Sequence, residues 1–120
     1  MNWTATYRHD SDFEVPYAKW LYYNGRAKNE RIIKNYAKGR TKKVAWFVSN
    51  CNAKNNRMEY ALELGKYIQI DIYGKCGKKK CKPRGKCFEM LKKNYKFYLA
   101  FENANCREYI TEKFFHNALR

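Results

Sequence analysis

Three short apolar runs lie between residues 44 and 101 of the sequence. They are Val44–Val48 (VAWFV), the alternating stretch Ile68–Tyr73 (IQIDIY) and Phe97–Phe101 (FYLAF). The first and third are continuous, as in strands buried on both faces, and the second alternates as a strand does. A polar loop and then a segment with helical spacing follow each run. The pattern predicts an α/β fold in which a short parallel sheet alternates with helices.

The segments that follow the three runs carry apolar residues three or four positions apart. This spacing places them on one face of a helix. We expect the first helix to begin at Arg57, where the polar stretch 49–56 ends. The positions that carry the spacing are Met58, Ala61, Leu62 and Gly65, the stretch 87–93 (CFEMLKK), and Ile110, Phe114 and Ala118 within 109–119.

The first forty residues lack this order. Residues 1–23 are rich in Trp and Tyr without a sustained period, and Pro16 interrupts them, which predicts irregular structure. Residues 24–43 are polar and basic, which indicates a linker or a surface helix. An irregular segment is therefore expected to precede the α/β unit.

The composition is that of a small folded domain. The chain has 120 residues, of which 45% are apolar and 18% aromatic, too many for a disordered basic tail. No stretch approaches ~18 consecutive apolar residues, and the N-terminus lacks the apolar run of a signal peptide. We therefore expect neither an anchor nor an export signal within this stretch.

The chain is strongly basic, with a formal net charge of +15 at pH 7. Nucleic acid, an acidic membrane surface and a phosphate-bearing small molecule are all admissible partners. The basic residues gather in 26–43 and 75–87, and solvated loops would explain both blocks equally well.

Five cysteines leave two interpretations open. Cys76, Cys81 and Cys87 lie in KCGKKKCKPRGKC, where the spacing departs from the tight pairs of structural zinc sites. A lysine-rich loop closed by a disulfide, in an oxidising compartment, suits this segment better. Asn2 begins an N-glycosylation acceptor pattern, Asn-Trp-Thr, which such a compartment would make usable.

Two of the loops can hold an anion. Ligands of open parallel sheets bind at the carboxyl ends of the strands. After the first strand, the start of a helix and Arg57 can meet phosphate oxygens; the alternative is a helix cap with a solvated arginine. After the third strand, helical spacing puts Tyr109, Glu112, Lys113 and His116 on one face, although an ordinary surface would look the same. Both loops should open onto one crevice.

The sequence shows neither a G-x-S-x-G nucleophile nor a Gly-rich phosphate-binding fingerprint. His9 and His116 are its only histidines. Catalytic residues are therefore not evident from motifs of this kind.

A set of motifs, in this order along the whole chain, resembles the α-1,3-fucosyltransferases of glycosyltransferase family 10. The segment after Tyr73-Gly74 resembles the invertebrate branch of that family. The motifs are Asn2-Trp3-Thr4 through Tyr7-Arg8-His9-Asp10-Ser11-Asp12 with Val15-Pro16-Tyr17, Val48-Ser49-Asn50 with Arg57 seven residues on, Tyr73-Gly74, and Phe97-Tyr98-Leu99-Ala100-Phe101-Glu102-Asn103 running into Tyr109-Ile110-Thr111-Glu112-Lys113.

The resemblance implies an inverting enzyme of the GT-B type, which moves L-fucose from GDP-fucose to the 3-hydroxyl of N-acetylglucosamine or glucose in a glycan or glycoprotein. It implies no required metal or other cofactor and no nucleic-acid partner. Residues 1–40 would border the acceptor domain and form the interdomain linker, and 41–120 would be the N-terminal part of the Rossmann-like donor domain. The family's members are Golgi membrane proteins with a lumenal catalytic part, whose anchor would precede this chain.

The resemblance also assigns roles to residues. The general base would be a carboxylate upstream of Asn2, so we expect this chain to recognise the donor without catalysing transfer. The donor-binding residues would be Arg57 and Lys113 on the diphosphate, Ser49 and Asn50 at the phosphates, Asn103, Tyr109 and Glu112 along the nucleotide-sugar pocket, and Tyr17 and Tyr98 at its border.

Three further expectations can be tested against a structure. Cys51 and Cys106 lie in the two donor loops, and we expect them to pair across the site. A basic nucleic-acid-binding module with Lys78–Lys80 as its key residues is the main alternative function. A small zinc domain built on Cys76, Cys81 and Cys87 is a third.

Overall fold

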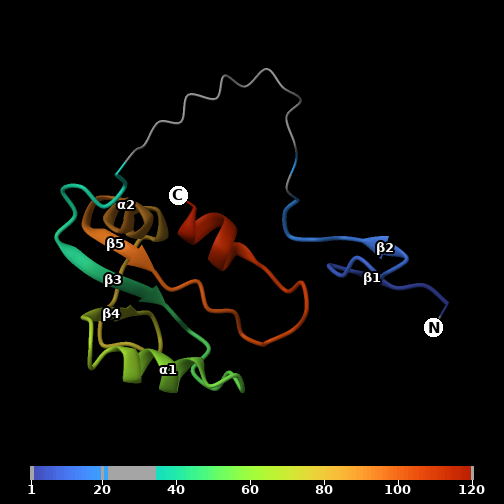
Figure 1. Ribbon diagram of the computed structural model, residues 1–120, viewed down its shortest axis with the longest axis horizontal. Helices are drawn as coiled ribbons and strands as arrows, with labels where there is room; N and C mark the ends of the chain where they lie inside the picture. Colours follow the sequence, from blue (N-terminus) through green and yellow to red (C-terminus); the bar gives the residue numbers. More distant parts are fainter. Residues whose placement is uncertain (1, 20, 22–34, 120) are drawn as a thin grey trace.

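A computed structural model describes residues 2–19, 21 and 35–119 of the chain (Figure 1). Most of the predicted linker or surface helix at 24–43 lies outside the described residues. The elements, in chain order, are β1 (Ala5–Thr6), β2 (Phe13–Glu14), β3 (Lys42–Phe47), α1 (Arg57–Leu64), β4 (Ile70–Tyr73), α2 (Arg84–Asn94), β5 (Tyr95–Tyr98) and the π-helical turn η1 (Lys113–Ala118).

A three-stranded parallel sheet of order β4-β3-β5 forms the centre of the fold. The central strand is β3, since its apolar run can be buried on both faces: Val44, Ala45 and Trp46 are all at most 4% exposed. The predicted α/β class with a short parallel sheet is confirmed.

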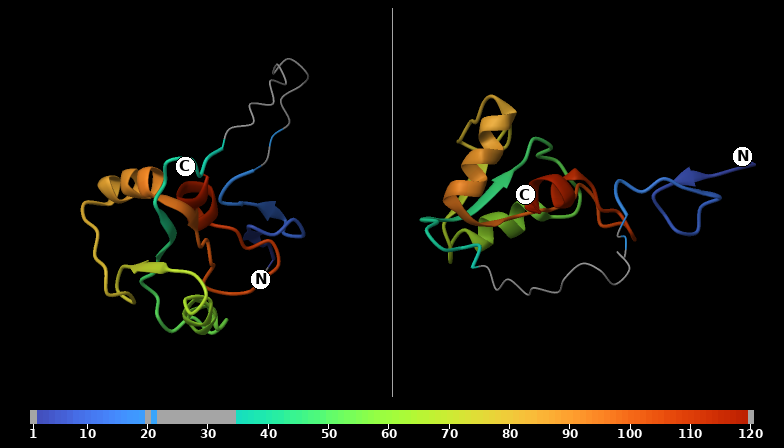
Figure 2. Two further views of the ribbon diagram at one scale, coloured as in Figure 1. Left: turned by 60° about the vertical axis from the view of Figure 1, so that its left-hand side comes forward. Right: turned by 90° about the horizontal axis from the view of Figure 1, so that it is seen from above.

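The two helices cover opposite faces of this sheet (Figures 1 and 2). On the α1 side, Trp46 and Val48 pack with Ala61. On the α2 side, Ala45 packs with Leu91. Alternate residues of β3 therefore serve two cores, and each core excludes water from one face of the strand.

Several predicted boundaries were wrong. β3 spans residues 42–47 rather than 44–48, and β5 ends at Tyr98 rather than at residue 101. The third run is also not buried on both faces as expected, since β5 is an edge strand and Phe97 is 59% exposed. β5 begins at Tyr95, two residues before the predicted strand, because Tyr95 is buried on the α2 face where its hydroxyl reaches Asp71. β4 begins at Ile70 rather than at residue 68. The helix expected over 109–119 is reduced to η1, which begins at Lys113. The chain before η1 is not helical because the Thr111 amide donates a hydrogen bond to Glu102 Oε1 at 2.7 Å. Tyr109 therefore lies outside the helix.

Two predictions about the helices are confirmed. α1 begins at Arg57 as expected, and α2 contains the whole predicted stretch 87–93. The predicted apolar face of α1 was partly wrong, however: Ala61 is buried, but Leu62 is exposed because the sheet covers only one side of this helix. Among the described residues, the helices are all too short or too polar to cross a membrane.

The N-terminal segment is irregular apart from the two-residue strands β1 and β2, which pair in parallel. It lies against the chain that follows β5: the His9 amide donates to Glu108 Oε2 at 2.9 Å, and the rings of Tyr7 and Tyr109 are 5.2 Å apart. Asn2 is exposed, as a glycosylation acceptor must be. The N-terminal segment thus contacts the loop that follows β5.

The lysine-rich segment after β4 folds back along that edge strand. The Lys79 amide donates to Ile72 O, and Lys79 Nζ lies 2.8 Å from Asp71 Oδ1. Tyr95 also donates a hydrogen bond to Asp71, and Tyr73 bonds to Tyr95 at 2.7 Å. The buried carboxylate of Asp71 thus fixes the lysine-rich segment to the sheet. The segment in turn covers the edge of β4, whose backbone groups would otherwise be open to solvent.

This carboxylate predicts acid-sensitive stability. Burial acts to raise the pKa of Asp71, but the hydrogen bonds from Lys79 and Tyr95 outweigh it and hold the pKa below its ordinary value of 3.8. A lowered pKa stabilises the fold above the unfolded-state pKa, and that stability is lost as pH falls through the folded-state value. Asp71→Asn should therefore melt at a lower temperature than the wild type at pH 7. The difference between the two melting temperatures should become smaller below about pH 4. Thermal melts from pH 7 to pH 3 test this; a difference that stays constant would contradict it.

Candidate functional site

A cavity of about 750 Å³ opens at the carboxyl ends of the three parallel strands. This is where an open α/β sheet is expected to bind its ligand, and the size suits a small molecule. Because β3 has β4 on one side and β5 on the other, the loops after all three strands meet there. The wall residues are Phe47, Val48, Ser49, Asn50, Arg57, Tyr73, Gly74, Lys75, Lys80, Cys81, Lys82, Cys87, Phe88, Asn103, Glu112, Lys113 and Asn117.

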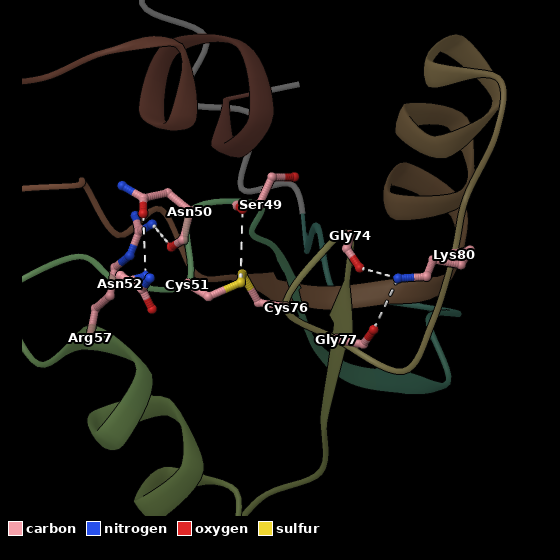
Figure 3. Close-up of a disulfide and its surroundings, with 9 residues drawn as sticks. All are labelled: Ser49, Asn50, Cys51, Asn52, Arg57, Gly74, Cys76, Gly77 and Lys80. Atoms are coloured by element: carbon pink, nitrogen blue, oxygen red, sulfur yellow. Dashed lines mark hydrogen bonds between the residues drawn. A yellow bond between two sulfur atoms is a disulfide. The ribbon is translucent and has the colours of Figure 1, made fainter.

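A disulfide joins the loops after β3 and β4 at this cavity (Figure 3). Cys51 pairs with Cys76, and their Cα atoms are 5.4 Å apart. The predicted pairing of Cys51 with Cys106 was wrong. The Cys76 amide donates to Val48 O, which brings Cys76 beside the loop that carries Cys51, whereas Cys106 is an exposed free thiol.

Arg57 connects the loops after β3 and β5. It is 6% exposed, and its Nη1 donates to Phe101 O and Glu102 O, each at 3.0 Å. Its Nη2 donates to Asn50 O at 2.7 Å, a bond drawn in Figure 3. Burial lowers the pKa of Arg57, and the charge of Glu102 opposes that shift. The side chain lines the cavity, and it also holds two of the cavity's walls together.

Lys113 lies in a cluster of opposite charges at the start of η1. Its Nζ is 2.9 Å from Glu102 Oε2 and 3.3 Å from Glu112 Oε1. Burial acts to lower the pKa of Lys113, but the two carboxylates outweigh it and keep the pKa above its ordinary value. For Glu112, burial acts to raise the pKa, and the hydrogen bond from Thr111 and the charge of Lys113 bring it below its ordinary value. Both groups are therefore charged at neutral pH.

The structure brings six of the nine predicted donor-binding residues to the cavity wall and leaves three away from it. Tyr17 stacks on Phe115, Tyr109 packs on Tyr7, and Tyr98 accepts a hydrogen bond from Asn117 behind the wall. Burial raises the pKa of Tyr98. The six on the wall are Ser49, Asn50, Arg57, Asn103, Glu112 and Lys113.

Sequence reasoning missed the contribution of the lysine-rich segment. Lys75, Lys80 and Lys82 all line the cavity, and Lys80 Nζ donates to Gly74 O at 2.7 Å (Figure 3). A signal was available, since this segment follows the second predicted strand, whose carboxyl end lies at the same edge as the other two. The rule that ligands bind at the carboxyl ends of parallel strands therefore applies to the lysine-rich segment as well.

Glycine shapes this part of the wall. Gly74 has a positive φ of 104°, and a Cβ there would lie 2.5 Å from Val48 O. A Cβ on Gly77 would lie 2.1 Å from Ile72 O. Larger residues at either position would force the lysine-rich segment away from the strands.

The predicted disulfide-closed lysine loop is confirmed, since Cys81 pairs with Cys87. With Cys76 bonded to Cys51, all three cysteines of the zinc alternative lie in disulfides and cannot act as thiolate ligands. Over residues 2–19, 21 and 35–119, the structure holds no group of three or more His, Cys, Asp or Glu side chains that could bind a metal ion.

Comparison with known proteins identifies the family of this chain. The family model described as glycosyltransferase family 10 (fucosyltransferase), C-terminal part, matches residues 37–120. Glycoprotein 3-alpha-L-fucosyltransferase A of Drosophila melanogaster is 60% identical over 121 residues, which cover 99% of this chain. Alpha-(1,3)-fucosyltransferase C of Drosophila melanogaster is 39% identical over 95% of the chain, and alpha-(1,3)-fucosyltransferase 4 of Bos taurus is 38% identical over 98%. The chain belongs to glycosyltransferase family 10, the fucosyltransferases.

The chain spans only part of these relatives. It covers 24%, 31% and 29% of their respective lengths. The comparisons give no support to the nucleic-acid-binding alternative.

Proposed function

We propose that this chain carries the donor-recognition part of an α-1,3-fucosyltransferase that takes GDP-fucose. The observation that carries the proposal is the charge of the cavity wall, which holds five cationic side chains and a single carboxylate among the described residues. A diphosphate in this cavity would meet cations from all three strand-end loops. The cations are Arg57, Lys75, Lys80, Lys82 and Lys113, and the carboxylate is Glu112.

Within this proposal, the cations stabilise the departing GDP. Negative charge develops on the diphosphate as the bond to fucose breaks, and a fixed positive charge in a water-poor cavity lowers the energy of that transition state. Lys113 is the best placed donor, because the carboxylates of Glu102 and Glu112 hold its Nζ in position at the cavity wall. The proposed enzyme therefore needs no metal ion for this step.

The remaining predicted residues take supporting roles. Ser49 and Asn50 lie in the loop after β3, where their polar groups can reach phosphate oxygens. Glu112 and Asn103 lie on the β5 side, and the carboxylate of Glu112 suits ribose hydroxyl groups as donors. Tyr17, Tyr98 and Tyr109 would act from outside the wall, by packing behind or beside it.

The acceptor and the chemistry of its activation belong to the whole enzyme. Glu112 is the only carboxylate on the cavity wall in the part of the chain that the structure describes, and Lys113 neutralises it, which makes it a poor base. We propose that the base lies outside residues 1–120, so that the chain binds donor without catalysing transfer. Inverting transfer to the 3-hydroxyl of N-acetylglucosamine or glucose, at the lumenal face of the Golgi membrane, completes the proposal. In it, residues 1–40 link to the acceptor domain and 41–120 begin a GT-B-type donor domain.

Calorimetry with GDP tests the donor assignment. In EDTA and at moderate salt, the chain should bind GDP at least about tenfold more tightly than ADP, a difference of about 1.4 kcal/mol. Equal affinities would leave a diphosphate site but reject guanine recognition. No binding by protein that unfolds cooperatively would reject the site itself.

A further inference from the structure

A basic surface lies at the amino ends of the strands, at the opposite end of the sheet from the donor cavity. It combines the chain that leads into β3 with the last turn of α2 and the first residues of β5. Strand pairing brings these segments together, since Lys42 is the register partner of Tyr95, and Arg40 Nη1 donates to Tyr95 O at 2.8 Å. We call this region the amino-end surface. Its cations are Lys38, Arg40, Lys42, Lys43, Lys92, Lys93 and Lys96.

Most of these cations lack an ionic partner in the part of the chain that the structure describes. Lys42 Nζ lies 3.9 Å from Asp71 Oδ2. The other six cations take no part in the ion pairs found among the described residues. Glu89 is the one carboxylate within residues 35–43 and 84–98. The amino-end surface therefore keeps a large positive charge.

The fold accounts for only part of this charge. Lys92 and Lys93 lie in the last turn of α2, where cations compensate the negative end of the helix dipole. Lys38, Lys43 and Lys96 make no side-chain contact of this kind with the described residues. Like charges this close repel one another, so an anionic partner would stabilise them.

The shape of the surface favours a broad partner over a small ligand. Arg40, Lys92 and Lys96 surround a hollow of about 80 Å³, whereas small-molecule sites usually have about 300–1,000 Å³. Phe97 lines the same hollow and is 59% exposed. An exposed phenyl ring among lysines is typical of surfaces that lie on a bilayer, where the ring enters the boundary between headgroups and acyl chains.

We propose that the amino-end surface binds an anionic lipid bilayer. Its lysines lie over the headgroup phosphates, which are mobile and require no fixed geometry, and Phe97 contacts the headgroup boundary. Because β3 is six residues long, the donor cavity lies roughly 20 Å away and stays open to solvent. The proposal rests on the surface charge and does not depend on which nucleotide the donor cavity binds.

Vesicle sedimentation tests this proposal on the chain with its disulfides formed. At about 0.1 M NaCl, the chain should sediment with mixed phosphatidylserine–phosphatidylcholine vesicles and remain in solution with pure phosphatidylcholine. Raising the salt to about 1 M shortens the screening length from about 10 Å to about 3 Å and should release the protein. Equal binding to both kinds of vesicle would contradict an electrostatic surface.

A triple variant removes one cation from each segment of the surface. The substitutions are Lys38→Gln, Lys92→Gln and Lys96→Gln. Together they should weaken vesicle binding about tenfold, while thermal unfolding stays cooperative. The single charge reversal Lys38→Glu, at an exposed position before β3, is a second variant that leaves α2 and β5 intact. It should weaken binding about threefold.

A matched triple variant separates this surface from the overall charge of a basic protein. Lys19→Gln, Lys54→Gln and Lys66→Gln lower the net charge by the same amount at exposed positions outside the amino-end surface. They should change vesicle binding by less than about threefold, and Lys54→Glu is the control for the single reversal. Equal losses from the two triple variants would overturn the proposal.

Two competitors distinguish the other sources of anionic charge. GDP in excess should leave vesicle binding unchanged, because the donor cavity lies at the other end of the strands. Release by GDP would mean that headgroup phosphates enter the donor cavity, and would overturn the proposal. Binding to polyglutamate without binding to anionic vesicles would also overturn it, in favour of an acidic protein segment.

Discussion

Replacing Arg57 by alanine is expected to lower the free energy of unfolding by about 2–6 kcal/mol, from about 1–3 kcal/mol for each of two buried carbonyls that lose their donor. The side chain is 6% exposed and donates to the carbonyls of Asn50, Phe101 and Glu102. Its loss would take the arginine donor away from the carbonyls of Asn50 and Phe101, while Glu102 O would keep its hydrogen bond from Asn55 Nδ2. The loops after β3 and β5 would therefore be held together less firmly. Urea denaturation, followed by tryptophan fluorescence, measures the change.

Arg107→Ala is the matched control for this experiment. Arg107 lies in the loop after β5, its side chain is 74% exposed, and its ion pair is with the adjacent residue Glu108. An exposed pair of this kind contributes at most about 1 kcal/mol. Similar midpoints for the Arg57 and Arg107 variants would mean that Arg57 does not hold the two loops together.

Arg57→Lys separates the two roles of the side chain. Lysine keeps the positive charge but cannot reproduce the planar fork that reaches carbonyls on both loops. We expect the lysine variant to remain destabilised, by more than half of the alanine effect. Full rescue of stability by lysine would show that charge alone matters at this position.

Replacing Lys113 by methionine is expected to weaken GDP binding about 100-fold, or about 2.7 kcal/mol. The variant loses the cation beside the diphosphate and also leaves Glu102 and Glu112 without their shared partner. Their negative charge would then repel the ligand across a partly buried cavity. Calorimetry with GDP measures the loss.

Lys54→Met controls for net charge, because Lys54 lies in the loop after β3 without lining the cavity. It should leave GDP affinity within about twofold of the wild type at moderate salt. If both lysine variants lose affinity equally, the effect comes from the overall field of a basic protein. If neither loses affinity, Lys113 does not contact the diphosphate.

The position of the lysine-rich segment could not be predicted from the local sequence pattern. The sequence indicated a solvated basic loop or a nucleic-acid contact, whereas the structure turns Lys75, Lys80 and Lys82 toward the cavity. That orientation depends on the ion pair between Lys79 and Asp71 and on the tight turn at Gly74. Contacts of this kind leave no periodic signal along the chain.

The alternation of apolar and polar positions determined by itself that this protein is α/β with parallel strands, and that the loops carrying Arg57 and Lys113 meet at one edge of the sheet. The type of each element follows from side-chain periodicity, which is a local property, and the parallel direction follows from the alternation of strands with helices. The tertiary structure alone decided that β3 is central, that Cys51 pairs with Cys76, and that Arg57 bonds to backbone carbonyls. These outcomes depend on which segments pack side by side, and packing joins residues far apart in the sequence.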